Sequence, residues 1–181
     1  MGKDIADEII KQLCKDILLP LGVFQKGNSR TYIDDNGYFF TVIEFQPSAY
    51  AKGTYLNVAL HFLGNENEDI SFDFPFGADI RVMDFVEYQN EEQFAREVTR
   101  YVQKAVTQVL FYRKLQDVAV AKSYAKKWLK RYKDNNCISK LNMFEHLDDE
   151  EVLLRIKQTR KFWRNKPSMN KMKNHETYDF Y

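Results

Sequence analysis

The sequence predicts an α+β protein: an N-terminal helix, an antiparallel four- to five-stranded meander, and then three C-terminal helices packed on one sheet face. Three observations lead to this fold class. Apolar side chains alternate with period two between residues 26 and 63, turn residues separate the alternating runs, and both ends of the chain carry apolar residues at helical spacing. At 181 residues the chain fits one domain, expected over residues 1–164, followed by a polar and basic tail over residues 165–181.

The first helix is predicted from about Lys3 to Leu19, because its apolar residues recur every three or four positions. Pro20 and Gly22 are expected to end it. A strand over Phe24–Ile33 follows, and its alternating polar side chains indicate an edge strand or a half-exposed strand.

Two runs form the centre of the predicted meander, Tyr38–Gln46 and Tyr55–Leu63. Asp35-Asn36-Gly37 precedes the first run and supplies residues that tolerate positive φ in a tight hairpin. The next strand is predicted at Ile70–Phe76, and Asp79–Tyr88 is a candidate for a last one. Because side chains alternate along a strand, one face is apolar and turned to the core, formed by Phe39, Thr41, Ile43, Phe45, Leu56, Val58, Leu60, Phe62, Ile70, Phe72, Phe74 and Phe76.

The opposite face of the predicted sheet mixes aromatic and polar side chains, a composition that suits a binding surface. We interpret this face as the place where a non-catalytic interaction module binds a protein partner. The alternative is that the last helix and the tail cover it and turn it into a second core layer. The candidate binding residues are Tyr38, Phe40, Glu44, Gln46, Tyr55, Asn57, His61 and Asp73.

The helical part of the chain is predicted to begin at Asn90, with Gln93 completing a variant of the capping box. The helix that follows has an unbroken apolar stripe, and a second helix is expected over about Leu115–Tyr132. These two should pack on the apolar face of the sheet. A last helix is predicted from Asp148 to Arg164, with Pro167 stopping it.

The charges of the chain are divided between its two parts. Residues 1–100 carry 9 Lys+Arg and 17 Asp+Glu, a net charge of −8, whereas residues 101–181 carry 18 and 9, a net charge of +9. Each part then solvates its own outer surface, or the two parts attract each other, or the basic part contacts an anionic partner such as nucleic acid. The aromatic residues among the lysines favour a core role over base stacking, because Trp128, Tyr132, Phe162 and Trp163 lie on the apolar stripes.

No motif in the sequence indicates a cofactor or a metal site. His61, His146 and His175 are isolated, and neither a P-loop, nor a GxGxxG loop, nor a GxSxG elbow occurs. One catalytic alternative remains. Asp35 followed by Glu44 and Gln46 resembles the D…ExK arrangement of restriction-endonuclease-like nucleases, in which two acidic groups bind a divalent cation. Gln46 stands where that pattern has lysine.

The sequence indicates a cytoplasmic protein that does not enter a membrane. No apolar run approaches the roughly 18 residues of a membrane helix, and the first residues lack a signal-peptide core. The two cysteines, Cys14 and Cys137, have no metal or redox spacing. Cys14 falls on the apolar stripe of the first helix, so we interpret it as a core residue and not as a nucleophile.

Three runs in the chain, KGNSRTYIDDNGYFF, EFQPSAYAKGTYLNV and SFDFPFGADIRV, resemble an uncharacterised bacterial family of unknown function. In that family a leading helix precedes a "GF-KKG" strand, a meander and C-terminal helices. The resemblance spans about Leu13 to Arg113, and Val23 between Gly22 and Phe24 departs from the pattern. It implies the α+β fold and a bacterial origin but no known activity, so it assigns no functional residues.

Overall fold

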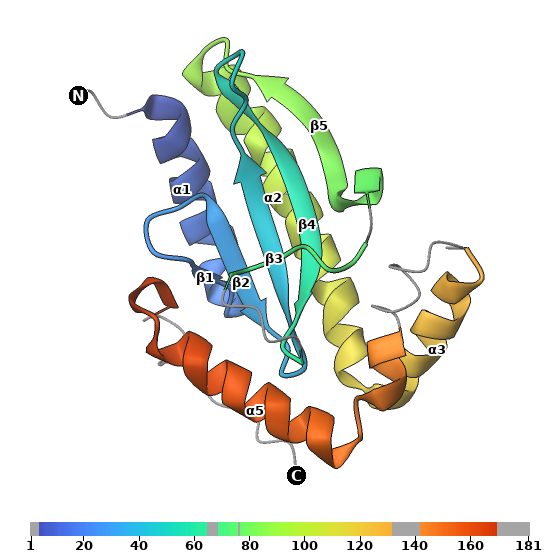
Figure 1. Ribbon diagram of the computed structural model, residues 1–181. Coiled ribbons are helices and arrows are strands. Elements are labelled where there is room, and N and C mark those ends of the chain that lie inside the picture. Colours follow the sequence, from blue (N-terminus) through green and yellow to red (C-terminus); the bar gives the residue numbers. More distant parts are fainter. Residues whose placement is uncertain (1–3, 65–68, 76, 132–141, 170–181) are drawn as a thin grey trace.

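A computed structural model describes residues 4–64, 69–75, 77–131 and 142–169 of the chain (Figure 1). It confirms the α+β fold, with an N-terminal helix, one five-stranded antiparallel sheet and then further helices. The strands follow one another in space as they do in the sequence. They are β1 (Phe24–Gln25), β2 (Thr31–Asp35), β3 (Phe39–Gln46), β4 (Gly53–Phe62) and β5 (Arg81–Glu87).

The predicted apolar face of the two central strands is confirmed by their register. Thr41 lies opposite Leu60, and Ile43 lies opposite Val58, so these side chains share one face and are buried. Helices α1 (Ile5–Ile17) and α2 (Glu91–Arg113) lie side by side across this face (Figure 1). The stability of the domain therefore depends on the contact between this apolar face and the two helices.

The predicted strand Phe24–Ile33 is a hairpin in the structure, because the chain reverses between β1 and β2. Gly27 adopts a φ of +56°, a conformation that side chains disfavour, and the Ser29 hydroxyl donates to the Lys26 carbonyl at 2.7 Å. The turn brings Arg30 to the first helix, where its Nε donates to the Asp7 carboxylate at 2.8 Å. Strand β1 is thereby the short edge of the sheet.

The predicted strand Ile70–Phe76 is also different, since among its described residues only Phe74 makes a bridge, opposite Leu60. The Asp73 carboxylate accepts the backbone N–H of Phe62 at 2.9 Å, a bond made by a side chain where a ladder would use backbone. Ile70, Phe72 and Phe74 do not form one apolar row, because Phe74 packs on the helical side while Phe72 lines a pocket on the other face. Phe76 lies outside the described residues. A short helix, η2 (Gly77–Ile80), leads into β5.

The helices keep their predicted order with shifted ends. Asn90 caps α2 as predicted, and its side chain accepts the Gln93 N–H at 2.9 Å. Helix α3 (Val118–Leu129) begins at the cap Asp117, later than predicted, because η3 (Lys114–Gln116) precedes it. Helix α5 (Glu150–Asn165) begins after Asp149 and not after Asp148, whose carboxylate is bound by Lys122 at 2.7 Å. Two further short helices are η1 (Leu19–Leu21) and η4 (Met143–His146).

Helix α5 lies on the face of the sheet opposite α2, which differs from the expectation that all three C-terminal helices share one face. Trp163 of α5 packs edge-on against Phe40 and His61, and Arg160 is paired with Asp35. Residues 165–169, the start of the predicted polar and basic tail, contact the body of the domain. Met169 is buried, and the Gly27 N–H donates to the Ser168 carbonyl at 2.7 Å. The rest of the predicted tail lies outside the described residues.

Candidate functional site

The mixed face of the sheet is divided into a covered end and an open end. Phe40 pairs with His61 at one end, Val42 pairs with Ala59 in the middle, and Glu44 pairs with Asn57 at the other end. Helix α5 crosses the end that carries the aromatic residues (Figure 1). The alternative in which the last helix covers this face therefore holds for the end with Phe40 and His61, and binding of a partner at the other end stays a prediction.

Four of the eight predicted binding residues are buried at the covered end and are corrected here to core residues. Phe40 and His61 have no exposed surface, Asp73 is 1% exposed and Tyr38 is 7% exposed. For Phe40 and His61 the physical reason is the indole of Trp163, which lies on this pair and is itself buried. Asp73 is buried beside His61, and Tyr38 belongs to the hydrophobic core. None of the four is accessible to a partner in this structure.

His61 and Asp73 form a buried polar cluster with Ser71. The Ser71 backbone N–H donates to His61 Nδ1 at 3.2 Å, and the Ser71 hydroxyl donates to Asp73 at 2.9 Å. Since Nδ1 accepts a hydrogen bond, the neutral ring carries its proton on Nε2, which has no hydrogen-bond partner among the described residues. Burial lowers the pKa of His61, while the Asp73 carboxylate 3.5 Å away acts in the opposite direction. The cluster therefore holds a neutral histidine in the core.

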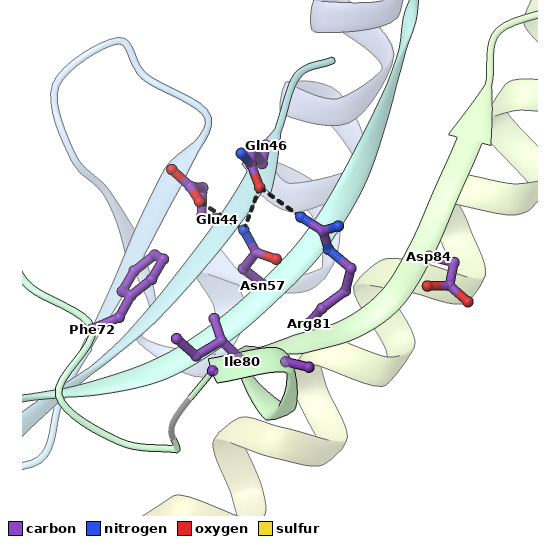
Figure 2. Close-up of a pocket in the computed structure, with 9 residues that line it drawn as sticks. Glu44, Gln46, Asn57, Phe72, Ile80, Arg81 and Asp84 are labelled. Atoms are coloured by element: carbon purple, nitrogen blue, oxygen red, sulfur yellow. Dashed lines mark hydrogen bonds between the residues drawn. The ribbon is translucent and has the colours of Figure 1, made fainter. Parts of the chain in front are cut away.

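The open end of the face holds a pocket of about 540 Å³ beside β5 and η2 (Figure 2). Its floor is a row of side chains across three strands, because Asn57 of β4 pairs with Glu44 of β3 on one side and with Arg81 of β5 on the other. Phe72 and Ile80 give the pocket an apolar wall. The volume lies within the range of small-molecule and peptide side-chain sites.

Hydrogen bonds connect the polar side chains of the pocket into one chain. Asn57 Nδ2 donates to Glu44 Oε2 at 2.9 Å and to Gln46 Oε1 at 2.8 Å. Arg81 Nη2 donates to the same Gln46 oxygen at 3.1 Å (Figure 2). Asn57 is only 5% exposed, so its amide is a fixed support for the charged groups at either end of the row.

Tyr55 holds the Arg81 guanidinium flat. The guanidinium carbon lies 3.9 Å from the centre of the Tyr55 ring, and Phe85 packs against the same ring with centroids 5.0 Å apart. Phe85 also lies over Gly53, where an added Cβ would stand 2.6 Å from the Phe85 ring and 2.1 Å from the Val86 carbonyl oxygen. The missing side chain at Gly53 therefore lets the rings that support Arg81 come together.

Arg81 and Phe72 belong to the pocket but were not among the predicted site residues. The strand that carries Arg81 was predicted, yet its register was not, because irregular pairing with β4 occurs on either side of Leu56. Alternation within one strand cannot reveal which residue of a neighbouring strand stands opposite. The predicted residues Glu44, Gln46, Tyr55 and Asn57 do converge at this pocket.

The residues of the nuclease alternative are not brought together. Asp35 lies opposite Phe40, whereas Glu44 lies four positions further along β3, a separation of about 13 Å at the usual rise per residue. The Asp35 carboxylate accepts hydrogen bonds from Arg160 and from the Gly37 N–H. One cation cannot bridge carboxylates at that distance. Nowhere in the described ranges do three or more His, Cys, Asp or Glu residues gather in a way that could hold a metal ion.

Cys14 is buried in α1, and burial raises the pKa of its thiol to about 12. The interpretation of Cys14 as a core residue agrees with this environment, because a protonated and covered thiol is a poor nucleophile. Cys137 lies outside the described residues. Within the part of the chain that the structure covers, no helix has both the length and the apolar character needed to cross a bilayer.

The aromatic residues of the basic helices have different environments. Trp163 is buried as predicted, but Trp128 is half-buried and lines a second pocket with Tyr124 and Arg131. Lys126, Lys127 and Lys130 of α3 are exposed. A nucleic-acid partner for the basic part of the chain stays a prediction.

Comparison with known proteins adds no identification: family models, curated proteins and solved structures all gave no match to this chain. The resemblance to a bacterial family of unknown function therefore stays a prediction.

Proposed function

We propose that the protein is a non-catalytic interaction module that binds a protein partner at the open end of its mixed sheet face. The observation that carries this proposal is the row Glu44–Asn57–Arg81, which stands in an open pocket and whose charged ends have no ion-pair partner in the part of the chain that the structure describes. Polar side chains on an aromatic and apolar support are common at protein interfaces.

Among the described residues that line the pocket are charged and polar side chains that can bind a partner, but no pair of a nucleophile and a base. Glu44 and Asp84 line it, yet no histidine, serine or cysteine lies among its lining residues. A nucleophile beside a base is therefore absent from the lining. Binding is the chemistry that these side chains support best.

Site-specific photocrosslinking in the native host tests this proposal. Ala78 lines the pocket and is exposed, so a benzophenone amino acid at position 78 would lie within reach of a bound partner. Ala119 of α3 is exposed and remote from the pocket lining, and it serves as the matched control position. We expect a discrete protein adduct from position 78 but not from position 119.

The adduct should disappear when Arg81→Glu is added to the photoreactive variant, provided that the thermal midpoint is unchanged. Loss of the adduct in a folded variant supports binding at this pocket. An adduct that survives Arg81→Glu, or equal adducts from both positions, would show that the pocket is not the interface.

A further inference from the structure

We infer that the pocket binds an extended segment of the partner that carries one acidic and one basic side chain two residues apart. This inference rests on the proposed function and adds the chemistry of the segment. The acidic side chain binds Arg81, and the basic side chain binds Glu44.

Among the described residues, Arg81 has no carboxylate within ion-pair distance. Each other described arginine except Arg164 has a carboxylate oxygen within 4.0 Å of its guanidinium. Arg81 instead stacks on Tyr55 and donates one hydrogen bond to Gln46. A guanidinium held flat in this way keeps donors on its other edge for a carboxylate from outside the chain.

Glu44 has the complementary role. Its Oε2 accepts from Asn57, and no basic side chain in the described residues lies within ion-pair distance of it. The carboxylate is half-buried next to apolar walls, where an unpaired charge is less well solvated than on an open surface. A lysine or arginine of the partner would form an ion pair with the Glu44 carboxylate and offset its charge.

The distance between the two groups sets the spacing of the partner's charges. Glu44 Oε2 and Arg81 Nη2 are joined through hydrogen bonds of 2.9, 2.8 and 3.1 Å, so they lie at most about 9 Å apart. Side chains at positions i and i+2 of an extended chain leave the same face about 7 Å apart. Neighbouring residues i and i+1 point to opposite faces, so a spacing of one intervening residue places both charges on the face that meets the pocket.

Two isomeric peptides test this spacing. The probes are N-acetylated, C-amidated Glu-Ala-Lys and Ala-Glu-Lys, which have the same composition and net charge. Each is titrated into the labelled full-length protein while backbone amide resonances are followed by NMR. We expect Glu-Ala-Lys to shift the resonances around Glu44, Asn57 and Arg81 and to bind at least fivefold more tightly than Ala-Glu-Lys.

Two variants of the pocket assign the charges, and one remote variant serves as control. Arg81→Gln and Glu44→Gln should each weaken Glu-Ala-Lys about fivefold, the factor that roughly 1 kcal/mol of a partly exposed ion pair corresponds to. Arg96→Gln, on an α2 side chain that is 66% exposed, should leave the affinity unchanged.

Equal binding of the two isomers, or binding that survives both pocket substitutions, would overturn the inference. The absence of any shift with either peptide at millimolar concentration would do the same. A protein adduct at position 78 together with failed peptide binding would leave the proposed function standing and refute only the charge spacing. Peptide binding without an adduct would refute the protein partner in that host and support the chemistry of the pocket.

Discussion

Arg160 of α5 donates to the Asp35 carboxylate of β2 at 2.6 Å, across 125 residues of sequence. Both side chains are only 11% exposed, so water screens this ion pair poorly. It is one of the contacts that fix α5 on the sheet, beside the packing of Trp163 on Phe40. The pair therefore has a structural role, and this role occupies a carboxylate that a metal-dependent nuclease would need free.

We expect Arg160→Met to destabilise the protein by about 2 kcal/mol, because it leaves the Asp35 carboxylate half-buried without its partner. Asp35→Asn should lower the free energy of unfolding by less than Arg160→Met does. The double variant should lose less stability than the two single variants lose together. Urea denaturation of the four proteins gives the coupling energy. If the two losses in the free energy of unfolding add to within about 0.3 kcal/mol, as losses at independent sites do, the ion pair contributes nothing to stability.

Leu60→Asp should prevent folding, because it places a carboxylate on the buried apolar face between the sheet and the helices. The matched control is Leu154→Asp on α5, where the native side chain is 57% exposed. We expect the control to change the thermal midpoint by only a few degrees. A soluble Leu60→Asp protein with the wild-type midpoint would show that the face has been assigned incorrectly.

Stability should fall as the pH drops below about 6.5, the ordinary pKa of histidine in an unfolded chain. Burial lowers the pKa of His61 in the folded protein, so the unfolded chain takes up a proton that the folded protein refuses. The contribution of neutral, buried His61 to the free energy of unfolding is complete above pH 6.5. Below pH 6.5 this contribution is lost at up to about 1.4 kcal/mol per pH unit.

Urea denaturation between pH 5 and pH 7.5 measures this dependence, and His61→Gln should flatten it. The side chains that face His61 are Asp73, Ser71, Phe40 and Trp163, and only Asp73 is ionisable. His146→Gln, at a histidine that is 60% exposed, is the comparison variant for the effect of removing a surface histidine. A slope that persists in His61→Gln would assign it to other groups.

The Cys14 thiol should be inert in the folded protein. At pH 8 a thiol with a pKa of about 12 holds about a thousandfold less thiolate than one with the ordinary value of 9, and burial also blocks the reagent. In a Cys137→Ser background, Cys14 is the single thiol of the chain. Dithionitrobenzoate should label it only after denaturant is added. Complete labelling within minutes under native conditions would place Cys14 at the surface.

The parts of the fold that the sequence predicted correctly are those that depend on local pattern. Period-two alternation identified the apolar face with Leu60, and the spacing of Asn90 and Gln93 identified the start of α2. The failures have a different origin. The turn at Gly27 depends on one positive φ inside a run that alternates well, so the run was interpreted as a single strand.

The sequence predicted only those residues of the candidate site whose position depends on alternation within one strand. Glu44 and Asn57 share a face by alternation, but the position of Arg81 depends on irregular pairing between β4 and β5. The burial of Phe40 and His61 depends on which face α5 chooses, and an apolar stripe with Ile156 and Trp163 fits either face equally well. These outcomes are set by tertiary packing, which a pattern within one segment does not contain.

The absence of a side chain at Gly53 limits which substitutions this position can accept during evolution. A methyl group there would meet the Val86 carbonyl oxygen at 2.1 Å, and backbone cannot move aside as a flexible side chain can. Any relative that gains a side chain at this position must shift its last strand, separate the rings of Tyr55 and Phe85, and lose the support of Arg81. Glycine at position 53 and arginine at position 81 should therefore be kept together or be replaced together among descendants of the same ancestor.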